Sequence, residues 1–188
     1  MIITQTTQRK NTLSSYVKAC ELLINKGIKT DVLDYGSGLG IGYQHMTNIF
    51  SNVESFEPYA KAPFKPTYTS VETILKQYNA ITCLNVLNVL DQNTRDISVL
   101  NILNLLNIKG YALISTRAFK NDIDQTKKGI IDPINKSVQF DNGLIQKGYD
   151  GNELLNYIKD IAYKNNINIS VLRINNISGN CVLIQRLN

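Results

Sequence analysis

The residues best suited to chemistry lie between Val32 and Gly40, in the run Val-Leu-Asp-Tyr-Gly-Ser-Gly-Leu-Gly. Glycines at three alternate positions, Gly36, Gly38 and Gly40, have no side chain, so the backbone turns sharply and admits a ligand almost against the main chain. An apolar strand-like stretch precedes this run and a helical stretch follows it. Such a loop lies at the carboxyl edge of a parallel sheet, where open α/β folds bind their ligands. We therefore predict a ligand site on these glycines.

Two phosphate-binding loops do not fit this run. A dinucleotide loop has the spacing G-x-G-x-x-G, but Ile41 stands where its third glycine belongs. A P-loop needs Gly-Lys followed by Ser or Thr, which the run lacks. Asp34 precedes the first glycine by two residues and would repel a pyrophosphate, whereas a carboxylate suits a cationic ligand. The pattern therefore indicates a ligand that carries positive charge.

A second acidic residue, Glu57, ends the next strand-like stretch and is followed by Pro58. It lies about 20 residues beyond the loop, at the spacing where an acidic side chain recognises ribose hydroxyls. A generic tight turn with an unrelated surface glutamate is the simpler explanation. The presence of both features in one sequence makes this simpler explanation the less favoured one.

Residues 32–40 together with Glu57 resemble the first two motifs of the class I S-adenosylmethionine-dependent methyltransferases. The resemblance covers about residues 30–188 and implies S-adenosylmethionine as the cofactor. It also implies a single doubly wound Rossmann-like α/β domain, with a mostly parallel seven-stranded sheet and an antiparallel C-terminal strand. The cofactor-binding residues that it implies are Asp34, Tyr35, Gly36, Gly38, Gly40, Glu57, Pro58 and Asn85.

In this family the acceptor chemistry follows the fourth strand, here at residues 85–88. Amino-group DNA methyltransferases carry Asp/Asn-Pro-Pro-Tyr/Phe there, but this stretch is Asn-Val-Leu-Asn. Cytosine C5 methylation needs a Pro-Cys pair, and Cys83 follows a threonine. Asn85, Asn88 and Tyr35 remain as catalytic candidates. The two asparagines are equally well explained as residues that end a strand and satisfy its backbone groups.

A weaker resemblance concerns methyltransferase-like proteins associated with DNA phosphorothioation and their phage relatives. It rests on residues 85–91 with Arg95, on residues 114–117 and on residues 146–149. It implies a phage or DNA-modification context and identifies no substrate.

The helices and strands that position these residues are predicted from the spacing of apolar residues along the chain. We predict helices over 12–25, 41–50, 71–78, 94–107 and 152–165, and strands over 31–35, 53–57, near Tyr68, and over 80–87, 111–116, 167–174 and 181–186. Alternation of this kind favours a mostly parallel sheet with helices on both faces. The last two strands have no helix between them, so they should pair antiparallel at one edge.

Residues 118–150 interrupt this alternation as a polar insert, which we expect to lie over the mouth of the site. Its glycines, its Pro133 and its charges of both signs indicate irregular structure. The substrate-binding candidates in and beside it are Arg117, Lys120, Lys147 and Tyr149. Cations interleaved with aromatic rings suit an anionic, stackable acceptor such as a nucleotide, DNA or RNA. A lid that excludes water around a small molecule is the alternative.

The 188-residue chain has room for one ordinary domain, and its 20 Lys and Arg against 15 Asp and Glu give a charge of +5. Four of these charges belong to residues 1–30, a basic N-terminal helical segment. The three cysteines are scattered and there is one histidine, His45, so we expect no metal site. The absence of a long apolar run and of a signal-peptide pattern favours a cytoplasmic protein with no membrane partner.

The function predicted from these observations is S-adenosylmethionine-dependent methyl transfer to a nucleic acid or nucleotide-like acceptor. Two alternatives stay open. One is a non-catalytic S-adenosylmethionine-binding accessory module of a modification or defence system, because the segment after the fourth strand carries no recognised acceptor motif. The other is a small-molecule methyltransferase. The sequence does not indicate an oligomeric state.

Overall fold

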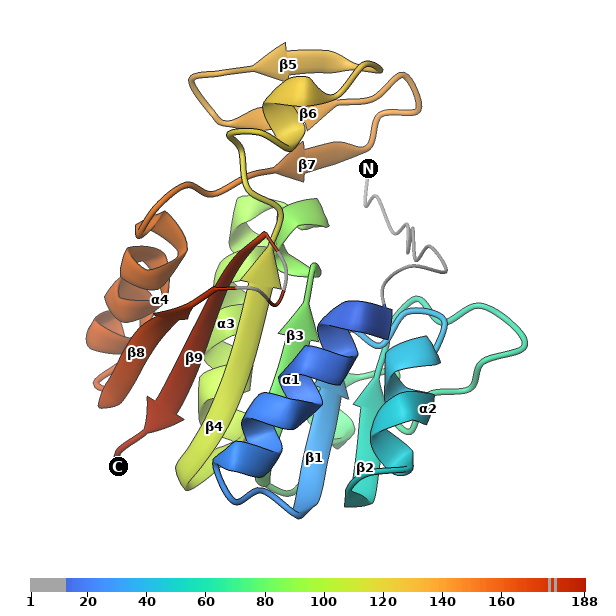
Figure 1. The fold of residues 1–188 in the computed structure, drawn as a ribbon, viewed down its shortest axis with the longest axis vertical. Helices are drawn as coiled ribbons and strands as arrows, with labels where there is room; N and C mark the ends of the chain where they lie inside the picture. The colour runs from blue at the N-terminus through green and yellow to red at the C-terminus, as the bar shows by residue number, and fades with distance from the viewer. Residues whose placement is uncertain (1–12, 176, 178) are drawn as a thin grey trace.

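A computed structural model describes residues 13–175, 177 and 179–188 (Figure 1). Within them the main sheet has six strands in the order β2-β1-β3-β4-β9-β8. Their bounds are β1 (Thr30–Tyr35), β2 (Ser51–Phe56), β3 (Tyr78–Leu84), β4 (Leu106–Thr116), β8 (Ile169–Ile174) and β9 (Asn180–Arg186). Strands β2, β1, β3 and β4 are parallel, and β9 is antiparallel to both β4 and β8. The predicted mostly parallel α/β sheet and its antiparallel last strand are confirmed.

The predicted seven strands are wrong by one, at the edge beside β2. There the chain forms an isolated parallel bridge between Phe56 and Tyr68. The Tyr68 N–H donates to the Ser55 carbonyl at 2.9 Å, and the Glu57 N–H donates to the Tyr68 carbonyl at 3.0 Å. Pro63 and Pro66, just before Tyr68, have no N–H to continue a ladder. Only one bridge therefore forms where the sequence predicts a strand.

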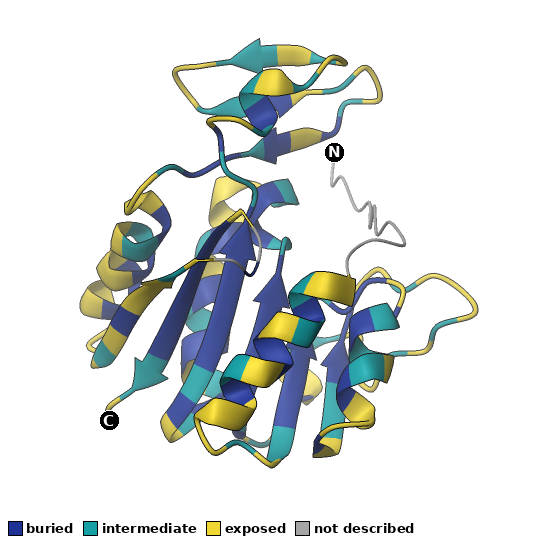
Figure 2. Cartoon of the chain, in the orientation of Figure 1, coloured by how far each residue is buried: buried dark blue, intermediate teal, exposed yellow. Residues whose placement is uncertain are grey.

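Helices cover both faces of the main sheet (Figure 1). On one face α1 (Leu13–Asn25) and α2 (Ile41–Thr47) enclose an apolar core that includes Leu23 and Met46. On the other face α3 (Gln92–Leu105) and α4 (Glu153–Lys164) enclose a larger core. The central strands β1, β3, β4 and β9 are buried over most of their length, whereas the edge strands β2 and β8 are more exposed (Figure 2). This two-faced cover is the doubly wound arrangement that the alternating pattern predicts.

The helix predicted over residues 71–78 is wrong. The structure has a single 3-10 turn over Val71–Thr73, after which Ile74 is extended (φ −85°, ψ 100°). Ile74 packs into the core while the next residue, Leu75, is 92% exposed. Tyr78 already belongs to β3, pairs with Leu106 and is fully buried. Too few residues therefore remain between turn and strand for a helix.

The segment 118–150 forms a second, three-stranded antiparallel sheet, which we call the small sheet. Its strands are β5 (Ile130–Asp132), β6 (Ser137–Gln139) and β7 (Ile145–Lys147), in the order β5-β6-β7. Val138 of β6 forms an apolar cluster with Phe119 and Ile123. Strands of three residues are too short to show a period in the sequence, so the small sheet was not predicted.

The strand predicted over 111–116 begins five residues earlier, so Leu106 and Asn107 lie in β4 and the end of the helix predicted over 94–107 is wrong. The other helices and strands begin and end within three residues of the predicted limits. Of the basic segment 1–30, the structure describes α1 and the residues that follow it, whereas Arg9 and Lys10 lie outside the described residues. No helix within the described ranges has the length and apolarity to cross a membrane.

Candidate functional site

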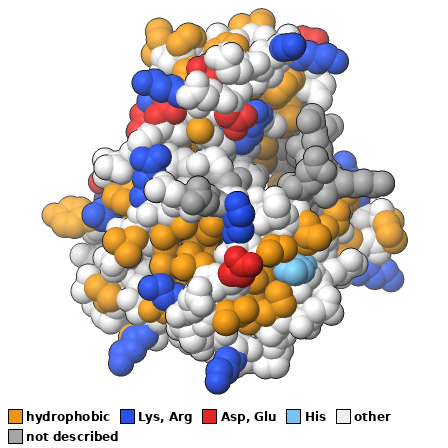
Figure 3. Space-filling model, in the orientation of Figure 1, with side chains coloured by type: hydrophobic (Ala, Val, Ile, Leu, Met, Phe, Trp, Pro, Cys, Tyr) orange, Lys and Arg blue, Asp and Glu red, His pale blue; other side chains and the backbone are white. Residues whose placement is uncertain are grey.

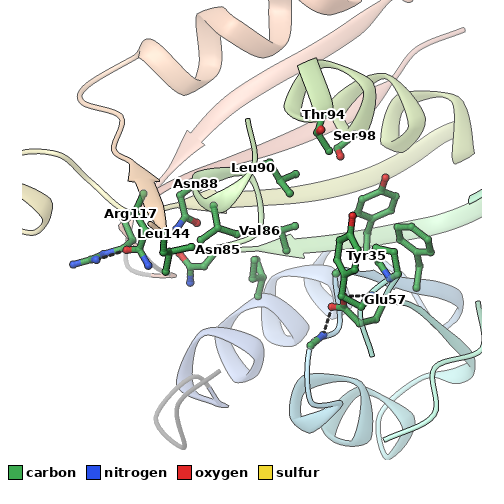
Figure 4. A pocket seen from close by; sticks show the side chains of 18 of the residues that line it. Tyr35, Glu57, Asn85, Val86, Asn88, Leu90, Thr94, Ser98, Arg117 and Leu144 are labelled. Carbon is green, nitrogen blue, oxygen red and sulfur yellow. Dashed lines mark hydrogen bonds between the residues drawn. The ribbon is translucent and has the colours of Figure 1, made fainter. Parts of the chain in front are cut away.

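A cavity of about 1090 Å³ lies at the carboxyl ends of β1, β2, β3 and β4. At one end it is lined by the glycine loop and Glu57, and at the other by Arg117 and residues of the small sheet. The segment that follows β3, with Asn85, Val86 and Asn88, lies between these ends (Figure 4). Because parallel strands end at the same edge, residues far apart in sequence meet here.

The glycine loop packs directly against the segment after β3. Gly36 has φ +81°, and a Cβ placed on it would lie 2.4 Å from Val86 Cγ2. A Cβ on Gly40 would lie 2.3 Å from the ring of Phe64, which covers that glycine. Gly36 and Gly38 line the cavity, whereas Gly40 does not. The loop thus needs glycine both for its left-handed backbone and for its close contacts.

Glu57 connects the end of β2 to the glycine loop. Its Oε2 accepts the Gly38 N–H at 2.8 Å and its Oε1 accepts the Tyr59 N–H at 3.1 Å. The side chain is 6% exposed and lines the cavity together with Pro58 (Figure 4). A carboxylate has about four lone-pair positions, so two of them remain for a ligand.

Asp34 lies behind the cavity wall. Its carboxylate is fully buried and accepts hydrogen bonds from the hydroxyls of Tyr16, at 3.0 and 3.2 Å, and of Thr82, at 2.9 Å. Burial raises the pKa of Asp34 to about 7, although the two hydroxyl donors lower it. Tyr16 lines the cavity but Asp34 does not. The predicted contact of Asp34 with a ligand stays a prediction; the structure shows a carboxylate that holds Tyr16 in place.

The three catalytic candidates, Tyr35, Asn85 and Asn88, all line the cavity (Figure 4). Tyr35 packs its ring 4.7 Å from that of Phe56, and burial raises its pKa. Asn85 turns the chain at φ +59°, and its N–H donates to the Ser115 carbonyl at 2.9 Å. Asn88 is 3% exposed, and its Oδ1 has no hydrogen-bond partner among the described residues.

Of the four predicted substrate-binding residues, only Arg117 lines the cavity. Its Nε donates to the Asp122 carboxylate at 3.1 Å and its Nη1 donates to Gln146 Oε1 at 2.5 Å. Lys120 is exposed outside the cavity. Lys147 donates to a backbone carbonyl at 2.9 Å, and the buried ring of Tyr149 packs 6.0 Å from that of Tyr157. Lys147 and Tyr149 do meet, since the Lys147 Nζ lies 5.4 Å from the centre of the Tyr149 ring, but outside the cavity. The structure therefore does not bring all four side chains together.

Sequence reasoning missed several cavity residues, among them residues 69–72 and three further groups. One is Tyr16, which lies in the helix predicted over residues 12–25 and was not among the predicted site residues. The second is a polar set on α3, and the third lies on the small sheet. They are Thr94, Ser98 and Asn101 on α3, and Asn142, Leu144 and Gln146 around the small sheet. Ser98 and Asn101 lie three residues apart on α3, the helix that follows residues 85–88, so they share one face of that helix. This spacing is visible in the sequence.

Within the described residues, no group of three His, Cys, Asp or Glu side chains is placed to hold a metal ion. The cysteines Cys20, Cys83 and Cys181 are all buried and unpaired with one another. Burial raises the pKa of the Cys83 thiol, so it stays protonated at neutral pH.

The sheet order, the glycine loop after β1 and the acidic residue after β2 define the class I methyltransferase fold. No protein-family model and no curated protein matches the sequence.

Solved structures of S-adenosylmethionine-dependent methyltransferases share the fold. The sugar N-methyltransferase KedS8 from Streptoalloteichus matches with a TM-score of 0.66 and 10% identity, over 100% of this chain and 99% of that one. CalS10, an amino pentose methyltransferase from Micromonospora echinaspora with bound cofactor, matches with a TM-score of 0.65 and 11% identity, over 94% and 92%. A methyltransferase from Clostridium acetobutylicum matches with a TM-score of 0.65 and 12% identity, over 96% and 93%.

Proposed function

We propose that this protein is an S-adenosylmethionine-dependent methyltransferase that acts on a small molecule. The observation that carries the proposal is one continuous cavity in a methyltransferase fold. It joins Glu57 and the glycine loop at one end to Asn88 and Arg117 at the other. Its volume exceeds the usual 300–1,000 Å³ of a single ligand pocket, so a cofactor and an acceptor fit together.

The residues at the glycine-loop end fit the cofactor. Glu57 keeps two acceptor positions for ribose hydroxyls after it has bound Gly38 and Tyr59. Gly36 and Gly38 present bare backbone to the cavity, and Tyr35 and Val86 present apolar surface beside it. When bound, S-adenosylmethionine supplies a methyl group on an electrophilic sulfonium. The protein then has to orient an acceptor toward that methyl group and exclude water.

A small acceptor is favoured because the small sheet supplies one wall of the cavity. Two cations in and beside this segment are paired with carboxylates. Arg117 pairs with Asp122, and Lys136 pairs with Glu153 and with Asp150. On the face shown in Figure 3, Lys and Arg side chains are scattered among other residues and form no single basic patch. Structures with the same fold include methyltransferases of sugars, of 1,6-didemethyltoxoflavin and of magnesium protoporphyrin IX.

The nucleic-acid acceptor and the phage or phosphorothioation context stay predictions. Binding to nucleic acid through Lys120 and its neighbours would weaken steeply as salt releases counterions. The simplest check is a mobility-shift titration with duplex DNA and with RNA at low and at high salt.

Calorimetric titration with S-adenosylmethionine and, separately, S-adenosylhomocysteine tests the proposal. We expect micromolar binding of both, which corresponds to about −8 kcal/mol. A folded protein that binds neither contradicts the cofactor assignment. Incubation with radiolabelled cofactor and fractionated cell extract tests the acceptor. Label in the small-molecule fraction supports the proposal, label in acid-precipitable nucleic acid favours the other acceptor class, and label in neither favours the accessory module.

A further inference from the structure

Arg95, near the start of α3, folds its side chain back onto the segment that precedes the helix. The residue is 5% exposed and does not line the cavity itself. Its Nε donates to the Leu87 carbonyl at 3.0 Å, and its Nη2 donates to the Leu90 carbonyl at 2.7 Å. Its Nη1 donates to Gln92 Oε1 at 3.1 Å. One buried guanidinium therefore holds the backbone at two points of the preceding segment.

This guanidinium is buried without a carboxylate partner. Among the described residues no ion pair involves Arg95. Its other neighbour is the ring of Tyr149, whose centre lies 6.0 Å from the Arg95 Cζ. An apolar side chain of similar volume is often as stable as a buried charge, or more stable. The arginine is therefore better explained by what its N–H groups hold than by the stability of the whole domain.

The segment that Arg95 holds forms the middle of the cavity wall. Its lining residues are Asn85, Val86, Asn88, Val89 and Leu90. Within the segment the backbone makes one 3-10 turn, with the Val89 N–H at 3.2 Å from the Val86 carbonyl and the Leu90 N–H at 3.4 Å from the Leu87 carbonyl. These bonds are long, and hydrogen bonds of 3-10 turns have poorer geometry than those of α-helices. The charged donors of Arg95 form shorter bonds and are the stronger restraint on this turn.

The same segment meets both ends of the cavity. At the cofactor end Val86 packs on the glycine loop, where a Cβ on Gly36 would lie 2.4 Å from Val86 Cγ2. At the other end Tyr149, which packs on Arg95, has its N–H bound to the Arg117 carbonyl at 3.1 Å. Figure 4 shows Val86 between Arg117 and Glu57. A shift of the segment would therefore change the shape of the cavity at both ends.

Resting on the function proposed above, we infer that Arg95 is a positioning residue, which holds residues 86–90 in the conformation that forms the wall between cofactor and acceptor. It touches neither ligand and acts through the carbonyls of Leu87 and Leu90. Removing its donors should loosen the segment while the main sheet stays folded. A lysine keeps the charge but lacks the planar fork that reaches two carbonyls at once.

Arg186 provides a matched control at the opposite end of α3. Its Nη1 donates to the carbonyls of Leu103 and Leu106, at 3.2 and 2.8 Å. The chemistry is the same as that of Arg95, but none of these three residues lines the cavity. A general effect of removing an arginine from backbone carbonyls at an end of α3 should appear in both variants. An effect on the cavity wall should appear only at Arg95.

The experiment measures amide hydrogen exchange without ligand, and S-adenosylhomocysteine affinity by calorimetry, in Arg95→Met, Arg95→Lys and Arg186→Met. In Arg95→Met we expect exchange of the Val89 and Leu90 amides to rise about tenfold, with exchange in β1 and β3 unchanged. The affinity should fall about three- to tenfold, because Val86 no longer supports the glycine loop. Arg95→Lys should lie between the parent and Arg95→Met. Arg186→Met should stay within about twofold of the parent in both measurements.

Unchanged exchange of the Val89 and Leu90 amides in Arg95→Met overturns the inference. Raised exchange with unchanged S-adenosylhomocysteine affinity also overturns it, and so do equal changes in Arg186→Met or an equal rise of exchange in β1 and β3. If Arg95→Met does not fold, parent-like exchange in Arg95→Lys overturns it instead. A parent protein that binds no S-adenosylhomocysteine contradicts the proposed function, whereas exchange without ligand still decides whether Arg95 holds the segment.

Discussion

The Tyr16 hydroxyl donates hydrogen bonds to both carboxylate oxygens of Asp34, at 3.0 and 3.2 Å. Thr82 donates to the same carboxylate at 2.9 Å, so α1, β1 and β3 meet at one buried acid. A Cβ on Gly42 would lie 2.2 Å from the Tyr16 ring, so α2 also leaves room for this tyrosine. The acidic residue of the glycine motif therefore helps to fix the helix that forms part of the cavity wall.

Asp34 should make stability fall as pH rises from about 4 to about 7. Its folded pKa is about 7 and its unfolded pKa is near the ordinary value of about 3.9. The folded state therefore binds more protons over this interval, and the free energy of unfolding decreases with pH. Asp34→Asn should remove this contribution, which amounts to about 4 kcal/mol at most. Urea unfolding of the parent and of Asp34→Asn across this pH interval gives the difference in unfolding free energy between them. A difference that does not change with pH would contradict the raised pKa of the buried Asp34 carboxyl.

Gly36→Ala should destabilise the protein more than Gly27→Ala. Both glycines have φ near +80°, so alanine costs about 1 kcal/mol at either position. At Gly27 a Cβ meets nothing within 4 Å, whereas at Gly36 it overlaps Val86. The overlap should add about 1–3 kcal/mol. Equal losses of unfolding free energy in the two variants would mean that the loop does not pack on Val86. If Gly36→Ala is the more destabilising, adding Val86→Ala should restore the free energy lost to the overlap but not the cost of the left-handed backbone.

The sequence predicted the alternating helices and strands because their apolar periods are long and are read over many residues. It also predicted the glycine loop and Glu57, which the structure places together through the Gly38 N–H. The prediction of secondary structure failed where tertiary contacts, and not the local pattern, determine the conformation. Ile74 packs inward in an extended conformation, and Pro66 leaves Tyr68 a single bridge in place of a strand. No local pattern shows that Tyr16 lies against Asp34, because 18 residues separate them.

Glu57→Gln should weaken the binding of S-adenosylhomocysteine by about 10- to 100-fold, or about 1.4–3 kcal/mol. Glutamine offers one oxygen where Glu57 uses two, for the N–H groups of Gly38 and Tyr59. Its amide nitrogen would face one of these donors, and no charged oxygen would remain for ribose hydroxyls. Calorimetry measures the change. Glu21→Gln, exposed on α1, is the matched control, and the same affinity in both variants would remove Glu57 from the site.

Breaking the contact between Arg117 and Asp122 should loosen the small sheet without unfolding the main one. Arg117 lies at the end of β4 and binds both Asp122 and Gln146, so it links the two sheets through side chains. The small sheet has its own apolar cluster of Phe119, Ile123 and Val138, which is too small to hold it alone.

The side chains of Arg117 and Asp122 are 30% and 37% exposed, which limits their coupling to about 1 kcal/mol. A double-mutant cycle of Arg117→Ala and Asp122→Ala, read from native-state hydrogen exchange in β5–β7, should give that value. Exchange in β1 and β3 should stay unchanged, because local opening does not need global unfolding. Lys120→Ala, at an exposed position of the same segment, should leave exchange in both sheets as it is. If amides of the small sheet exchanged only together with those of the main sheet in these variants, the contact between Arg117 and Asp122 would not be what holds the small sheet over the cavity.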